Sequence, residues 1–128
     1  AHRNIYKQTG HNAILHGHPK FSVIMSMYCD KKDCTYYLSR HLCYTACKKK
    51  RYVAGVPVVS GEIGTGPTGL MHTVPFAMKE GKGAIIYGHG VFTSGMNDFQ
   101  QPFNMLLNIE NACKERYFNK LSEYEILK

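Results

Sequence analysis

Two histidines stand one residue apart near the beginning of the chain, directly after a short apolar segment. The sequence there is AILHGHPKF, residues 13–21, and the two histidines are His16 and His18. In a β-strand, residues i and i+2 point to the same face, so the two imidazoles would lie side by side. Two parallel imidazoles can bind one metal ion. The same spacing also arises by chance or on exposed surfaces, so the pair leaves both interpretations open.

A third histidine, His89, follows another apolar segment, in the sequence IIYGHGVF, and has a glycine on each side. Glycine allows a ligand or another backbone segment to approach closely and adopts dihedral angles that other residues avoid. Three imidazoles at adjacent strand ends would give the arrangement of a catalytic Zn²⁺, with three protein ligands and one open position. Alternatively, His89 only forms a tight turn. The spacing supports a metal site but does not decide it.

The elements that would position these histidines alternate between strands and helices. We expect strands at residues 11–17, 56–61, 82–90 and 91–95. We expect helices that end at Gly10, follow Pro19 over residues 20–28, cover residues 70–81 despite Pro75, and run from Asn97 or Asp98 to about Phe118. Residues 29–55 are expected to be irregular, and EIGTGPTG at residues 62–69 to form a rigid loop. This alternation predicts an α/β fold.

The last of these helices has one stripe of side chains that we expect to face the protein core. The stripe follows helical periodicity and is mostly apolar. Its members are Phe103, Leu106, Leu107, Glu110, Cys113 and Tyr117.

Length and composition limit the class of protein. A chain of 128 residues with 44% hydrophobic residues suits one domain, residues 1–128, with one core. No apolar run approaches the roughly 20 residues that a membrane-spanning helix needs, so we expect a soluble, cytoplasmic protein with no membrane partner. The formal net charge is +7, and Lys48–Arg51 form a basic run. This run is a solvated loop or attracts anions, with phosphorylated small molecules preferred to nucleic acid, because no nucleic-acid-binding pattern accompanies it.

Four of the five cysteines lie within 19 residues and could form a separate metal site. Cys29, Cys34, Cys43 and Cys47 have spacings suitable for a structural zinc, although the tight C-x2-C pairs typical of such sites are missing. The alternative is that these cysteines are reduced and packed as small hydrophobic residues, like the separate Cys113.

Three ordered motifs resemble the class II aldolase/adducin family. They are HRNIY at His2–Tyr6, HGH at His16–His18, and GHG at Gly88–Gly90. The resemblance implies a three-layer α/β/α sandwich with a central, mostly antiparallel sheet and a homotetramer with active sites between subunits. It also implies that His16, His18 and His89 are the ligands of Zn²⁺ or another divalent metal.

The activity implied by the resemblance is that of a metal-dependent carbon–carbon lyase, an aldolase, acting on a small phosphorylated sugar while zinc stabilises an enediolate. A dehydratase or epimerase acting on a sugar phosphate is an alternative on the same scaffold. Non-catalytic alternatives are an adducin-like module, which is expected to lack the metal histidines, and a zinc-binding module organised by the cysteines.

The proton-transfer residue is less well defined than the metal ligands. In the family, a carboxylate shortly before the element matching His2 acts as the general acid/base. We therefore expect residues 1–128 to be the C-terminal portion of a class II aldolase-like domain, with its N-terminal part outside this chain. Within the chain, Glu62 in the glycine-rich loop is the candidate catalytic carboxylate, or else it only caps backbone N–H groups. Candidate proton-donating tyrosines are Tyr36, Tyr37 and Tyr124.

Overall fold

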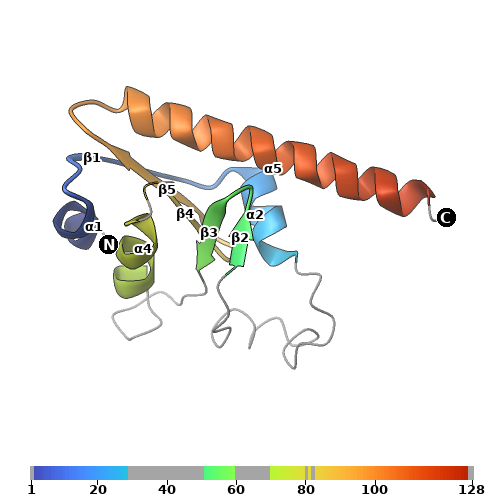
Figure 1. Ribbon diagram of the computed structural model, residues 1–128, viewed down its shortest axis with the longest axis horizontal. Helices are drawn as coiled ribbons and strands as arrows, with labels where there is room; N and C mark the ends of the chain where they lie inside the picture. The colour runs from blue at the N-terminus through green and yellow to red at the C-terminus, as the bar shows by residue number, and fades with distance from the viewer. Residues whose placement is uncertain (1, 29–50, 60–69, 80, 82, 127–128) are drawn as a thin grey trace.

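The computed structural model of the protein describes residues 2–28, 51–59, 70–79, 81 and 83–126 (Figure 1). The helices of these ranges are α1 (His2–Thr9), α2 (Lys20–Met27), α4 (Leu70–Met78) and α5 (Gln100–Ile126). The strands are β1 (Ala13–Gly17), β2 (Arg51–Val53), β3 (Val56–Val59), β4 (Ala84–Ile86) and β5 (Gly90–Gly95). None of the helices within these ranges combines the length and the apolar character needed to cross a bilayer.

The strands form a single mixed sheet in the order β1-β5-β4-β3-β2. β5 pairs with β1 on one side and with β4 on the other, and both pairings are antiparallel. β3 pairs with β4 in parallel, whereas β2 and β3 form an antiparallel hairpin. The expected mostly antiparallel sheet is therefore confirmed.

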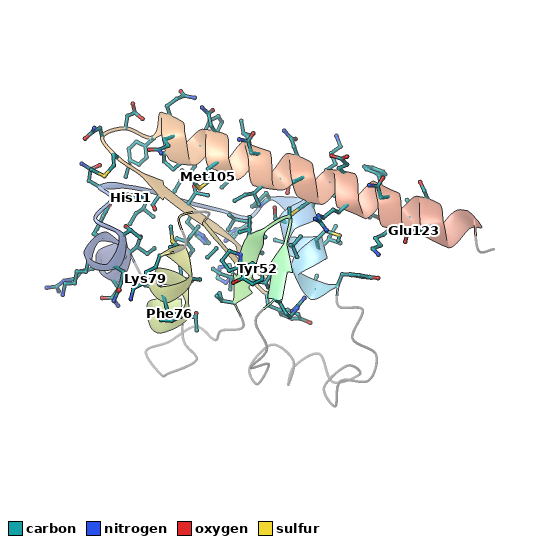
Figure 2. The ribbon with its side chains drawn as sticks, in the orientation of Figure 1. His11, Tyr52, Phe76, Lys79, Met105 and Glu123 are labelled. Atoms are coloured by element: carbon teal, nitrogen blue, oxygen red, sulfur yellow. The ribbon has the colours of Figure 1, made fainter. Side chains whose placement is uncertain are left out.

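Helices cover both faces of this sheet and complete the three layers. α1 and α4 pack together on one face, and α2 and α5 pack together on the other (Figure 1). Each face has its own apolar cluster, one including Ile5, Val74 and Phe92, and the other including Met25, Ile85 and Ile109. Figure 2 shows Met105 lying between α5 and the strands, whereas Glu123 lies on the end of α5 that projects beyond them.

Several of the sequence-based element boundaries differ from those of the structure. The expected strand at residues 82–90 is shorter, because β4 ends at Ile86 and residues 87–89 form a turn. The segment expected to be irregular as far as residue 55 contains β2 from Arg51. The last helix continues to Ile126 rather than ending near Phe118. The helix begins at Gln100, two residues after Asp98, and the Asp98 carboxylate accepts a hydrogen bond of 3.1 Å from the Gln100 N–H.

The buried face of α5 differs partly from the expected stripe. Phe103 and Leu107 are 47% and 42% exposed, whereas Ile109, outside the expected set, is buried. Cys113 is fully buried, and burial raises the pKa of its thiol, so it packs as a small apolar side chain. The side chains of α5 that pack into the core cluster on this face of the sheet are Met105, Leu106, Ile109, Cys113 and Tyr117.

The charged member of the stripe, Glu110, fixes the beginning of α2. Its carboxylate accepts hydrogen bonds from the backbone N–H groups of Phe21 and Ser22, at 3.0 and 2.8 Å. It also accepts a 2.8 Å bond from the Ser22 hydroxyl. The first N–H groups of a helix have no partner within the helix, and a negative charge at this end is favourable. Pro19, the residue before α2, provides no side-chain cap, so Glu110 of α5 does so instead.

Replacement of Glu110 should therefore destabilise the fold. We expect Glu110→Ala to lower the free energy of unfolding by about 2 kcal/mol or more, because it removes charge-assisted bonds and leaves the N–H groups of Phe21 and Ser22 without this acceptor. Chemical denaturation measures this difference. Glu115→Ala, at an exposed position of the same helix, should change stability by less than about 0.5 kcal/mol. Equal effects of the two substitutions would contradict the capping role.

Candidate metal centre

The pairing of β5 with two neighbours brings the three histidines together. His16 lies in β1 opposite Phe92 of β5, and His18 follows directly after β1. β5 also pairs with β4, and the turn between β4 and β5 ends at His89. Because Gly17 pairs with Val91, the beginning of β5 lies beside the residues that carry the first two imidazoles.

The turn that carries His89 depends on glycine. The His89 N–H donates to the Ile86 carbonyl at 3.0 Å, which closes a four-residue turn. Gly88, the third residue of this turn, has a φ of +64°. A type II turn requires a positive φ at this position, and residues other than glycine rarely adopt one. His89 therefore does form a tight turn, as the alternative interpretation held, and the turn also places it beside His16 and His18.

The distances among the three imidazoles suit one small metal ion. One nitrogen from each of His16, His18 and His89 lies within 4.8 Å of the others. The Nε2 atoms of His16 and His18 are 3.2 Å apart. Two nitrogen ligands at 2.0–2.1 Å from a tetrahedral zinc would be separated by about 3.3 Å. The cluster could therefore hold a divalent metal with only small side-chain movements.

The backbone of β5 orients the imidazole of His16. Its Nδ1 is 3.0 Å from the Val91 carbonyl oxygen, and a carbonyl only accepts hydrogen bonds, so this nitrogen carries the proton. In a neutral imidazole the Nε2 is then the nitrogen without a proton, and its electron pair can bind a metal. The ring also stacks on Phe92 at a centroid distance of 4.1 Å. Both contacts hold the ring with Nε2 toward the other histidines.

Burial and charge both favour the neutral form of His89. Desolvation lowers the pKa of its imidazole, and the nearby positive charge of His18 lowers it further. A metal binds the neutral form of histidine. The lowered pKa therefore keeps His89 available as a ligand at pH values at which an exposed histidine would already be protonated.

The other candidate residues are not placed by the structure. Glu62, Tyr36 and Tyr37 lie outside the described residues, as do the four clustered cysteines (Cys29, Cys34, Cys43 and Cys47). Tyr124 lies in the last turn of α5, where only the backbone is described. The sequence did not predict that the Val91 carbonyl is part of the site, because every residue type has a backbone carbonyl.

Comparisons with known proteins identify a matching family and a similar solved structure. Residues 1–117 match the model of the family described as Class II Aldolase and Adducin N-terminal domain. The fold is similar to the crystal structure of L-fuculose-1-phosphate aldolase from Thermus thermophilus, with a TM-score of 0.69 and 20% sequence identity. The match covers 95% of this chain and 60% of that chain, so this chain spans less than two thirds of that aldolase's length. No curated protein sequence gives a significant match.

A side chain at position 90 should disturb the candidate centre. A Cβ atom on Gly90 would lie 2.7 Å from Cδ2 of His18 and would also collide with the Gly17 carbonyl oxygen. We therefore expect Gly90→Ala to weaken zinc binding by at least about tenfold, as changes around metal ligands usually do. A competitive chelator titration measures the affinity.

The matched control is Gly17→Ala, whose Cβ would make only an ordinary contact of 3.4 Å with Leu106. It should bind zinc within about threefold of the original chain, because this contact leaves the ligands in place. Unchanged zinc affinity in Gly90→Ala would contradict this prediction, because it would show that zinc binding does not require the observed position of His18.

Proposed function

Because the chain belongs to the class II aldolase and adducin family, we propose that it carries the metal centre of an aldolase that cleaves a carbon–carbon bond in a small phosphorylated sugar. The observation that carries the proposal is the convergence of His16, His18 and His89, with one nitrogen of each within 4.8 Å of the others. Three imidazole ligands leave at least one coordination position for a substrate oxygen, as in catalytic zinc sites. A non-catalytic, adducin-like module would not need this arrangement.

The proposed metal ligands are His16, His18 and His89. When bound there, a divalent cation such as Zn²⁺ would act as a Lewis acid that stabilises the negative charge of an enediolate. The chain's own contribution is to hold the three imidazoles in position before the substrate arrives, through the Val91 carbonyl, the Phe92 ring and the β4–β5 turn. Such preorganisation avoids the cost of reorienting the ligands during the reaction.

We propose Glu62 as the residue that moves the proton, on the basis of its place in the sequence. Glu62 itself lies outside the described residues, but Val59, three positions earlier, ends β3 beside the turn that carries His89. The Tyr87 N–H of that turn donates to the Val59 carbonyl at 3.0 Å. Glu62 is thus three positions along the chain from a residue that is hydrogen-bonded to the turn proposed to bind the metal.

A phosphorylated sugar is the substrate class that the observations favour. The similar solved structure is named as an L-fuculose-1-phosphate aldolase, and the formal charge of +7 on this chain would attract an anionic substrate. A dehydratase or epimerase would use the same metal centre, since both reactions also pass through enediolate-like states. The products formed from a given sugar phosphate distinguish these activities from aldol cleavage.

The test is a lyase assay on zinc-loaded protein with a panel of ketose 1-phosphates, which follows release of dihydroxyacetone phosphate. We expect release that stops with a chelator and returns with zinc. His16→Ala should lose both the zinc and the turnover, whereas Glu62→Gln should keep one zinc per chain and lose turnover by about 100-fold or more, because it cannot transfer the proton. Glu115→Gln, on the exposed face of α5, is the matched carboxylate control and should retain activity.

Two results would contradict the proposal. Zinc retained in His16→Ala but lost in Cys34→Ser would place the metal at the cysteines and support a zinc-binding module. Zinc held by the histidines, with no cleavage of any ketose phosphate by the longest available form of the protein, would exclude the lyase and favour the dehydratase or a non-catalytic role.

A further inference from the structure

The turn that carries His89 is fixed by three successive backbone N–H groups, each with a different acceptor. The Tyr87 N–H donates to the Val59 carbonyl of β3, and the His89 N–H donates to the Ile86 carbonyl, both at 3.0 Å. The Gly88 N–H donates to the hydroxyl oxygen of Ser26 at 2.8 Å. Two of these acceptors are backbone carbonyls that any residue could supply. The third is a side chain, so the sequence specifies it.

The Ser26 hydroxyl is held in the orientation that this bond needs. Ser26 is fully buried in α2, and its hydroxyl donates to the Val23 carbonyl at 2.6 Å. Because the hydroxyl proton is engaged within the helix, the oxygen presents its electron pairs to Gly88. The hydroxyl therefore acts as a fixed acceptor between α2 and the turn.

The helix that carries Ser26 is anchored at both ends. Its first turn is capped by Glu110 of α5. At the other end, Nη2 of Arg51 donates to the carbonyls of Ser26 and Tyr28, both at 2.8 Å. A cation at this end of a helix is favourable, because the last carbonyls carry partial negative charge. α2 is thus a fixed support rather than a segment that could follow a displaced turn.

The same helix also begins two residues after His18. α2 therefore connects the two parts of the candidate centre: the chain leading into it carries His16 and His18, and its last turn holds the loop with His89. We propose that Ser26 is a positioning residue that holds His89 at the distance from His16 and His18 that a shared metal needs. This inference rests on the proposed metal centre and extends it to a residue that touches neither metal nor substrate.

The test compares Ser26→Ala with Ser22→Ala in the whole chain. Both serines are fully buried in α2, but the Ser22 hydroxyl donates to Glu110 and not to the turn. We expect Ser26→Ala to weaken zinc binding by about 10- to 100-fold, the usual effect of losing a support of a metal ligand. Ser22→Ala should stay within about threefold of the original affinity, even if both variants melt at a lower temperature. The visible spectrum of the Co²⁺-loaded protein should change only in Ser26→Ala, because only there is the ligand geometry altered.

A milder variant covers the case in which Ser26→Ala does not fold. Ser26→Cys keeps a weaker acceptor and should weaken zinc binding in the same direction but less. In the metal-free chain, the Gly88 amide should exchange with solvent faster in either Ser26 variant than in Ser22→Ala, which tests the hydrogen bond without any metal.

The outcomes separate this inference from the proposed function. Equal losses of affinity in Ser26→Ala and Ser22→Ala, or no loss in Ser26→Ala, would overturn the positioning role while leaving the metal centre intact. An original chain that binds no zinc would overturn the metal centre and the role of Ser26 together.

Discussion

The register of β1 against β5 determines where His16 and His18 lie relative to His89 in the candidate metal centre. His16 lies opposite Phe92, and the same strand continues back to the turn that ends at His89. Because side chains alternate along a strand, a slip of one residue would move both His16 and His18 to the other face. The approach of this pair to His89 therefore depends on the pairing of β1 with β5. Gly90, at the beginning of β5, leaves the space that the approach needs.

Polar contacts on one face of the sheet connect this register to the rest of the fold. Glu110 caps α2, Arg51 binds its last carbonyls, and Ser26 joins it to the β4–β5 turn. Each contact joins elements that are distant in sequence, and each satisfies polar groups that burial would otherwise leave unpaired. The ligand-bearing segments are thus supported by helices and strands rather than by a free loop. That support suits a site that must hold three imidazoles in one arrangement.

Local patterns in the sequence predicted the parts of the site that depend on local geometry. The i, i+2 spacing of His16 and His18 is a property of a single strand, and it was sufficient to predict that they lie together. The strand expected at residues 82–90 was wrong because it ignored the turn that Gly88 permits, yet the histidine within it was still identified. Glu110 was assigned to the buried stripe of the last helix, but its capping role depends on α2, nearly 90 residues earlier. Contacts of that kind leave no periodic signal along the chain.

The central claim is that the three histidines bind a metal, and X-ray absorption at the zinc edge of the zinc-loaded chain tests it most directly. Binding by the histidines predicts a first shell of about three imidazole nitrogens at 2.0–2.1 Å, completed by oxygen, with no sulfur. A shell dominated by sulfur at about 2.3 Å would assign the zinc to the cysteines instead and contradict the claim.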